Sequence, residues 1–454
     1  MSNTNTNESE NIMGTMPIKR LLMKMSLPMM VSMLVQALYN VVDSIFVAKV
    51  SENALTAVSM AFPLQMLTIA LGGGIGIGVN AILSRSLGEK NQENVNKSAM
   101  MGIFITIINI LIMLFIGIFV VRPFYELQTN SEEIIRCGVD YLSVICCVSF
   151  GIFFQVMFER LLQSTGKTFY AMITQTTGAI VNLILDPIMI FGLFGFPALG
   201  VKGAAVATVC GQIIAACLAF YINITKNKEI QFKLKALKPD LKMIGIIYSI
   251  GFPSIIMQSI GSVMVFCLNR ILIGFSSTAV AVFGVYFKLQ SFIFMPVFGL
   301  NMGIVPVVAY NYGAKNKKRM LDTVKYGMII AAIIMSVGTV IFELAPGLLF
   351  KMFSASEEMT KMGVVALRII AVHFPVAALC IVIGSVFQAL GNAVYSMLVS
   401  IARQIVVLIP AAAFLASFGN VDYVWFAFPI AEVMSLLISL FFYMRVNKKT
   451  ISTM

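Results

Sequence analysis

The sequence predicts an all-α polytopic membrane protein with twelve transmembrane helices. Hydrophobic residues fill 59% of the 454 positions, charged residues fill only 11%, and the mean hydropathy is +0.93. Soluble domains usually carry about 25% charged residues. Apolar runs of ~20 residues, each long enough to cross a bilayer, recur along the whole chain. The expected spans lie near residues 20–47, 53–83, 97–120, 131–158, 167–191, 201–224, 242–274, 278–310, 319–343, 360–385, 391–416 and 421–444.

The positive charges predict the orientation, because short cytoplasmic loops are enriched in Lys and Arg. Most of the 32 Lys and Arg residues lie near the two termini and in the loops after spans two, four, six and eight. Both termini are therefore expected to be cytoplasmic. The net charge of +12 follows from this bias, so it does not call for a nucleic-acid partner. Residues 1–16 are rich in Asn, Thr and Ser and are expected to form a disordered cytoplasmic tail rather than a signal peptide.

An internal repeat divides the chain into two halves. At an offset of 225 residues Pro28 falls on Pro253, and LGEKN (87–91) falls on YGAKN (312–316). Each half holds six spans, so both enter the membrane from the same side, as in transporters built from parallel repeats. At the same offset Gly74 and Gly78 fall on Gly299 and Gly303. The expected units are the tail 1–16, an N-lobe 17–225 (spans one to six), a basic linker 226–241, a C-lobe 242–446 (spans seven to twelve) and a tail 447–454.

Several motifs together resemble one transporter family. They are SLPMMVSMLVQALYNVVDSIFVAKV at the first span, SRSLGEKN after the second, NLILDPIMIFG at the fifth, GVKGAAVAT at the sixth and PVVAYNYGAKN at the eighth. In this order and spacing the chain resembles the multidrug and toxin extrusion (MATE) family, and within it the MepA-like branch. The resemblance covers nearly the whole chain. It implies two six-helix lobes around a central cavity, and export of chemically varied drugs driven by inward flow of H⁺ or Na⁺.

Polar residues inside the first-half spans are candidates for the coupling site, since ionisable groups in membranes are rare and usually functional. Asn182 and Asp186 are spaced i, i+4 and share a helix face. Asp43, in the first span, reaches a similar depth in the outer half at ~1.5 Å per residue. The resemblance implies that the N-lobe cation site is formed by Asp43, Asn182, Asp186 and Thr208, with Gln36 and Tyr39 also fitting the pattern.

Two chemistries remain open for this site. Two carboxylates in low dielectric cannot both ionise unpaired, so one of them would take up and release a proton. Alternatively, both carboxylates would hold Na⁺, with Asn182 and Thr208 supplying neutral oxygens. A purely structural interpretation also exists, in which Asp186 hydrogen-bonds a neighbouring helix and Asp43 ends a span at the outer interface.

The substrate cavity is expected to include Glu159, Asp186 and Met157. Glu159 lies near the inner end of the fourth span and would contact cationic drugs. The alternative is that it pairs with its neighbours Arg160 or Lys167.

The second half differs from the first. Some family members carry an acid in the seventh span eight residues after the proline, but Gly261 occupies that position here, which puts a C-lobe cation site in doubt. A structural pairing of Glu432 with Arg403 or Lys288 is one interpretation, and contact with anionic groups of a substrate is another. The residues concerned are Lys288, Arg368, Arg403, His373 and Glu432.

The predicted mechanism is secondary active transport. Pro28 and Pro253 open the two halves and favour kinks; the resemblance implies that bending at Pro28 closes the N-lobe cavity. No Walker motif or catalytic triad is present, so an ATP-driven pump and an enzyme are not expected, and the coupling ion would be the only cofactor. We expect a monomeric antiporter in the bacterial cytoplasmic membrane whose partners are drugs, toxic cations and lipids. A lipid-linked oligosaccharide flippase of the same superfamily is the alternative, followed by a channel.

Overall fold

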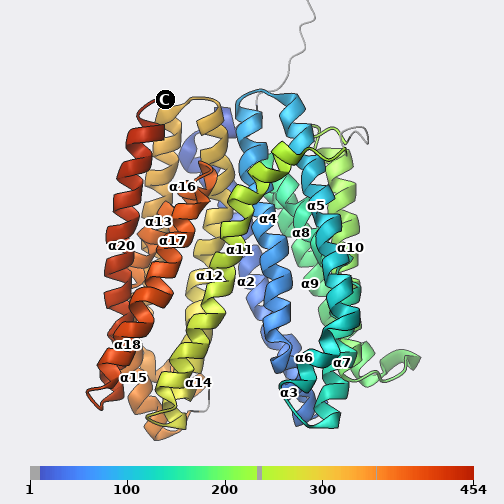
Figure 1. Ribbon diagram of the computed structural model, residues 1–454, viewed down its shortest axis with the longest axis vertical. Helices are drawn as coiled ribbons and strands as arrows, with labels where there is room; N and C mark the ends of the chain where they lie inside the picture. Colours follow the sequence, from blue (N-terminus) through green and yellow to red (C-terminus); the bar gives the residue numbers. More distant parts are fainter. Residues whose placement is uncertain (1–10, 233–237, 354) are drawn as a thin grey trace, which may run out of the picture.

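The computed structural model describes residues 11–232, 238–353 and 355–454 and shows two helical lobes (Figure 1). The N-lobe contains α2 (Ile18–Ala48), α3 (Glu52–Met60), α4 (Phe62–Gly88), α5 (Gln92–Phe119), α6 (Val121–Glu126), α7 (Glu132–Cys147), α8 (Phe150–Ser164), α9 (Thr168–Phe191) and α10 (Val201–Lys226). The C-lobe contains α11 (Leu241–Leu272), α12 (Ser277–Gly313), α13 (Lys317–Leu344), α14 (Pro346–Met352), α15 (Glu357–Ala371), α16 (Phe374–Ala389), α17 (Ala393–Ile401), α18 (Ile409–Ala416), α19 (Val421–Val424) and α20 (Ala427–Val446).

The helices confirm the predicted fold class. Ten helical spans of the described residues are long and apolar enough to cross a membrane, and two bent pairs raise the number to twelve. The bent pairs are α7 with α8, at 44°, and α15 with α16, at 49°. Each pair falls on one predicted span, near 131–158 and 360–385, and the bend within it is a feature that the structure adds.

The two breaks occupy equivalent places in the repeat, but only the second is adjacent to a proline. The second break precedes Pro375, which lies in the first turn of α16 and cannot donate a backbone hydrogen bond. The first break, at Val148 and Ser149, contains no proline, and the buried hydroxyl of Ser149 has no hydrogen-bond partner. The bend is therefore a property of both lobes, whereas the proline belongs to only one.

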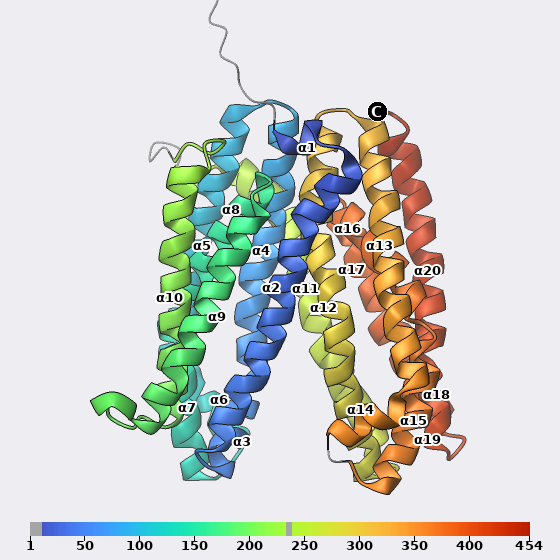
Figure 2. The same ribbon diagram turned by 180° about the vertical axis from the view of Figure 1, so that it is seen from behind.

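The lobes touch at one end and diverge toward the other. The α2 and α4 helices of the N-lobe pack against α11 and α12 of the C-lobe, and the end of the molecule at which the lobes meet is the one that holds α1 and the C-terminus (Figures 1 and 2). We call this the terminal end and the opposite one the far end. Pro28 and Pro253 lie inside the continuous helices α2 and α11.

A short N-terminal helix, α1 (Ile12–Thr15), lies across the terminal end between the lobes (Figure 2). On the N-lobe side, Asn11 Nδ2 donates a 3.0 Å hydrogen bond to the carbonyl of Thr165. On the C-lobe side, Arg319 Nη2 donates to the carbonyls of Met13 and Met16 at 3.0 and 2.8 Å. Residues 11–16 are therefore ordered rather than part of a disordered tail, while residues 1–10 lie outside the described residues.

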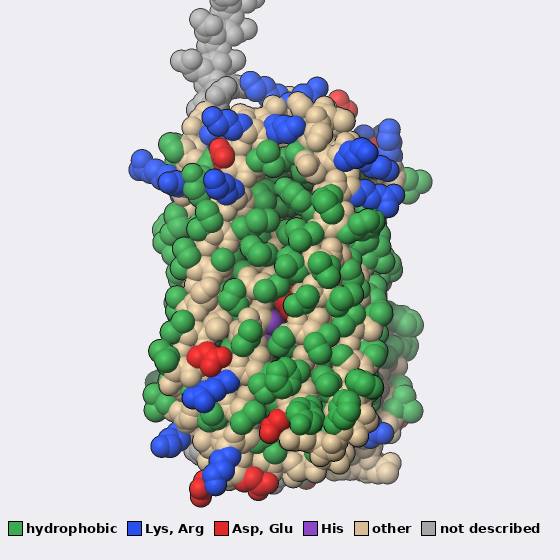
Figure 3. Space-filling model, turned by 90° about the vertical axis from the view of Figure 1, so that its left-hand side faces the viewer, with side chains coloured by type: hydrophobic (Ala, Val, Ile, Leu, Met, Phe, Trp, Pro, Cys, Tyr) green, Lys and Arg blue, Asp and Glu red, His purple; other side chains and the backbone are tan. Residues whose placement is uncertain are grey.

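The basic residues gather at the terminal end. On the face shown in Figure 3, Lys and Arg side chains crowd this end, while hydrophobic side chains cover the middle.

Part of the predicted linker is held against the N-lobe: Lys167 Nζ pairs with Glu229, and Gln92 Nε2 donates a 2.7 Å bond to the Glu229 carbonyl. Residues 233–237 of that linker lie outside the described residues.

Candidate functional site

A polar cluster forms in the N-lobe where α2, α9 and α10 meet. The α9 and α10 helices approach closely because Gly211 has no side chain: a Cβ there would lie 2.6 Å from the carbonyl oxygen of Gly178. This contact brings Asn182, one turn further along α9, next to Thr208 of α10. The predicted cation-site residues, on three helices, are therefore brought together: Tyr39 and Asp43 from α2, Asn182 and Asp186 from α9, and Thr208 from α10.

The Asn182 amide connects α9 to α10. When its nitrogen faces Asp186, Nδ2 donates to Asp186 Oδ2 at 2.9 Å, and the amide oxygen accepts from Thr208 Oγ1 at 3.1 Å and from the Thr208 backbone N–H at 2.8 Å. The Tyr39 hydroxyl lies 3.4 Å from Thr208 Oγ1. The neutral groups of the cluster thus hold one another in place around the carboxyl groups.

The two carboxyl groups of the cluster face each other. Asp43 and Asp186 are within hydrogen-bonding reach, and a hydrogen bond between two carboxyl groups requires a proton on one of them. The Oδ1 atom of each is buried without a partner, and Asp186 is 0% exposed. Buried polar atoms are normally satisfied, so these two oxygens are open acceptor positions of the cluster. Hard monovalent cations also prefer such oxygen ligands.

Gln36 lies beside this cluster in a second set of amides. Gln175 Nε2 donates to Gln36 Oε1 at 3.3 Å, and Gln36 Nε2 donates to Asn40 Oδ1 at 3.4 Å. Ser32 Oγ also bonds to Gln175. Gln175 was not among the predicted site residues, although its spacing of seven residues from Asn182 puts both on one face of α9.

Tyr141 of α7 is a second residue that was not predicted from the sequence. It is buried, accepts a 2.7 Å hydrogen bond from Gln65 Nε2, and lies near Asp43 and Tyr39. In the sequence Tyr141 only follows Asp140 near the edge of a span, and this does not indicate a role in the site. Its place beside the cluster comes from the packing of α7.

Glu159 lies away from the cluster, toward the terminal end. Its Oε1 accepts hydrogen bonds of 3.1 Å from both Gln155 and Thr174. Thr174 precedes Asp186 by twelve residues, which is about 18 Å along α9. The structure therefore does not bring Glu159 together with Asp186. Nor does it show the alternative pairing with Lys167, whose ammonium contacts Glu229.

Met157 does not join either group of polar residues. It is 1% exposed, and its sulfur packs against Gly102 of α5. Residues two apart on a helix point in nearly opposite directions, so Met157 faces the N-lobe interior while Glu159 faces α9. Its role in a substrate cavity stays a prediction.

In the C-lobe, the pairing of Glu432 is found with Arg403. Arg403 Nη1 lies 3.3 Å from Glu432 Oε2, while Lys288 is exposed. The other carboxylate oxygen, Oε1, is buried without a partner. Arg403 belongs to a π-helical segment, Ala402–Leu408, between α17 and α18. Arg368 instead faces Glu343 at 4.0 Å on the exposed surface.

His373 and Gly261 complete the C-lobe residues considered above. The His373 ring stacks on Phe428 at 6.2 Å between centroids. A Cβ at Gly261 would meet only Gln404 Oε1, at 3.9 Å. The nearest group to that position is therefore an amide and not an acid.

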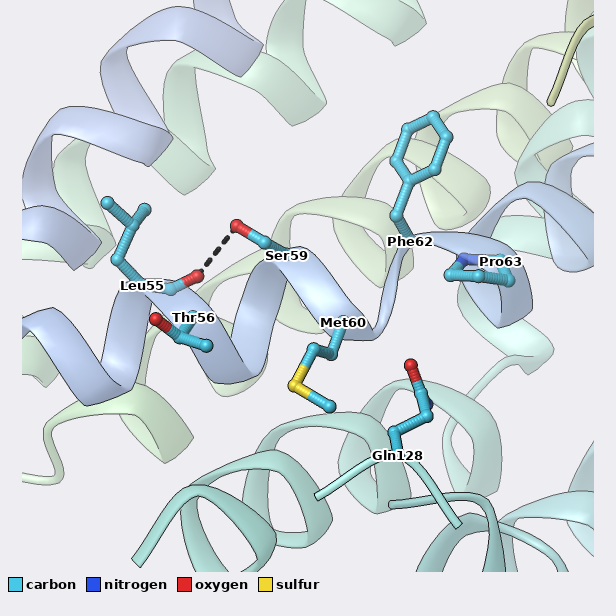
Figure 4. A pocket seen from close by; sticks show the side chains of 7 residues that line it. All are labelled: Leu55, Thr56, Ser59, Met60, Phe62, Pro63 and Gln128. Atoms are coloured by element: carbon cyan, nitrogen blue, oxygen red, sulfur yellow. Dashed lines mark hydrogen bonds between the residues drawn. The ribbon is translucent and has the colours of Figure 1, made fainter. Parts of the chain in front are cut away.

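A separate pocket opens at the far end of the N-lobe (Figure 4). It measures about 610 Å³ and lies between the break joining α3 to α4 and the loop after α6. The Ser59 hydroxyl that lines it already donates to the Leu55 carbonyl at 2.8 Å. The other lining residues are Thr56, Met60, Phe62, Pro63 and Gln128. None of the predicted site residues contributes to it.

Comparison with known families and proteins agrees with the repeat. The MatE family model matches residues 28–188 and again residues 253–414, so its two matches begin 225 residues apart. Multidrug export protein MepA of Staphylococcus haemolyticus (strain JCSC1435) is 28% identical over 93% of each chain. MepA of Staphylococcus aureus (strain NCTC 8325 / PS 47) is 27% identical over 96% of each chain.

Solved structures share the fold. A MATE mutant gives a TM-score of 0.90 at 23% identity, covering 98% of this chain and 99% of the other. An outward-facing multidrug resistance MATE family transporter of the MOP superfamily gives 0.89 at 24% identity, covering 96% and 97%. At these identities the similarity establishes the arrangement of the helices.

Proposed function

Because the chain belongs to the MatE family of membrane transporters, we propose that it exports multiple drugs in exchange for H⁺ or Na⁺ by alternating access between its two lobes. It is a multi-pass membrane protein and a transporter rather than an enzyme. The MepA relatives, which match over more than nine-tenths of both chains, support drugs as the substrates. The positive charge at the terminal end supports a cytoplasmic location for it in a bacterial plasma membrane.

One observation carries the coupling mechanism. Asp43 and Asp186 come from different helices and face each other, and each has a buried oxygen without a partner. A proton shared by the two carboxyls, or a Na⁺ completed by Asn182 and Thr208, would satisfy these oxygens. Two bare carboxylates about 4 Å apart repel by about 4 kcal/mol at an effective dielectric of 20.

This repulsion gives a route to movement through α2. The far half of α2 carries Asp43, whereas its terminal half packs on the C-lobe, where Ser26 Oγ donates to the Leu300 carbonyl at 3.2 Å. Pro28 lies close to that contact. Loss of the cation moves the far half of α2 away from α9, and rebinding of the cation returns it. Because the other half of α2 packs on the C-lobe, this movement changes the contact between the lobes.

Exchange follows from charge. The Asp43–Asp186 pair attracts a cationic drug when it is bare and loses that attraction when a proton or Na⁺ neutralises it. Drug and ion therefore compete for the same negative charge, which is the physical requirement for antiport. Glu159 is buried and hydrogen-bonded to Thr174, which lies about 18 Å from Asp186 along α9, and it offers a second acidic contact for a cationic drug closer to the terminal end.

The test is drug transport in proteoliposomes with an imposed pH or Na⁺ gradient. Wild-type protein should move an amphipathic cationic dye against its concentration gradient only when one of these gradients is present. Asp186→Asn should abolish this movement. Asp140→Asn, which changes an exposed acid of the same lobe, should not. Uphill movement retained by Asp186→Asn would remove the coupling assignment. Dye movement only down its own gradient would indicate a channel.

A further inference from the structure

Six glycines related by the internal repeat lie on the contact between the lobes. Those of α4 recur with spacings of four and ten residues, which puts them on one stripe about 80° wide, and the same spacings recur on α12. Both stripes run from the middle of the molecule to the terminal end. The repeat-related pairs are Gly74 with Gly299, Gly78 with Gly303, and Gly88 with Gly313.

The closest of these contacts joins α4 to α12 backbone to backbone. A Cβ built at Gly88 would lie 2.0 Å from the carbonyl oxygen of Tyr310, and one built at Gly313 would lie 2.1 Å from that of Arg85. Ordinary contacts begin at 3.4 Å. Neither backbone can shift as a flexible side chain could, so any side chain at these positions would force the helices apart by roughly 1.4 Å.

The other four glycines meet the opposite lobe in the same way. A Cβ at Gly74 would lie 2.9 Å from the carbonyl of Gly251, one at Gly78 2.5 Å from that of Ile247, one at Gly299 2.6 Å from the Met30 Cα, and one at Gly303 3.0 Å from the Ser26 Cα. We call this glycine-lined contact between α4, α12 and the opposite lobe the seam. Beside it, the Arg85 guanidinium lies over the Tyr312 ring at 4.8 Å. This cation–π contact also crosses from one lobe to the other.

We propose that these six glycines form the closed gate of the terminal end, and that their missing side chains set the balance between this arrangement and one in which the terminal end is open. The proposal rests on alternating access. The seam holds because the helix surfaces match at backbone distance, so it has two states, packed or parted, rather than a continuous range. A methyl group at its tightest point favours the parted state.

The experiment measures interlobe distances by pulsed electron paramagnetic resonance in nanodiscs, using full-length protein with its native cysteines replaced. One pair of spin labels, at Glu93 and Lys318, reports on the terminal end, and both residues are exposed. A second pair, at Leu127 (89% exposed) and Met352 (74% exposed), reports on the far end. Within each pair the two positions are themselves 225 residues apart, so the labels report on equivalent sites of the lobes.

The expected result is a change at both ends. Gly88→Ala with Gly313→Ala should add a component longer by on the order of 5 Å at the terminal end and a shorter one at the far end. Gly245→Ala and Gly284→Ala are matched controls in α11 and α12, since a Cβ at either meets nothing within 4 Å, and they should leave both distances unchanged.

Three outcomes overturn the proposal. The first is a folded Gly88→Ala, Gly313→Ala protein with wild-type distances, and the second is an equal shift in the controls. If the double variant does not fold, Arg85→Ala, which removes a contact across the seam without adding bulk, should give a smaller lengthening at the terminal end, and unchanged distances there are the third. Because no drug is needed, a protein that shows the shift but fails to export drugs would retain the gate and lose the proposed function.

Discussion

The ion pair of the C-lobe offers a quantitative test of whether its charges serve structure or substrate. The Glu432 side chain is only 4% exposed, and Arg403 Nη1, at 3.3 Å, is its ionic partner. Its other oxygen has no partner. Arg403→Met would therefore leave a buried carboxyl group without compensation.

The expected cost follows from the burial. Removing one partner of a buried ion pair costs about 3–5 kcal/mol, whereas replacing both by apolar residues of similar volume is often neutral or stabilising. Arg403→Met alone should lower the free energy of unfolding by about 3 kcal/mol or more. Arg403→Met with Glu432→Leu should recover most of this loss. The exposed pair of Arg368 and Glu343 is the control, and Arg368→Met should cost under ~1 kcal/mol.

The assay is equilibrium unfolding of the purified protein in mixed micelles, with helicity followed by circular dichroism, alongside drug transport in proteoliposomes. For a structural pair, the double variant should export drugs as the wild type does. A double variant no more stable than the single one, or a neutral Arg403→Met, would refute the reasoning. A stable double variant that no longer transports drugs would instead indicate that these charged side chains contact the substrate.

Three further predictions concern the cluster, the N-terminal helix and the start of α11. Asn182→Leu removes the hydrogen bond to Asp186 Oδ2 and the link to Thr208, so it should abolish ion-driven export and cost about 1–3 kcal/mol in unfolding experiments; normal export would contradict it. Arg319→Ala should free α1, seen as faster hydrogen exchange at residues 12–16, and unchanged exchange there would count against the contact. The Lys97 ammonium, together with backbone N–H groups of α11, holds the pKa of Asp240 below its ordinary value. Its stabilising contribution is therefore present at neutral pH and lost as the pH falls through that lowered pKa. Exchange at the first turn of α11 should accelerate in acid in the wild type but not in Asp240→Asn, and identical profiles would exclude the linkage.

The sequence determined the number of spans, their repeat and part of the site. In a bilayer each helical span satisfies its backbone hydrogen bonds within itself. Its apolar run can therefore be recognised in the sequence without knowledge of the neighbouring helices. Helical periodicity likewise places Asn182 and Asp186 on one face, and the same rule would have found Gln175. The rise per residue placed Asp43 at a similar depth, the resemblance added Thr208, and the structure brings both together with them.

Only the tertiary structure decided how the helices are turned and where they approach. Periodicity defines a face of one helix but not the neighbour that it meets. The sequence therefore did not predict that Tyr141 lies beside the cluster or that Met157 packs against Gly102 of α5. The glycines at 74, 78 and 88 were legible as a repeat. Only the structure shows why they are glycines: the backbone of the opposite lobe occupies the space that a side chain would need.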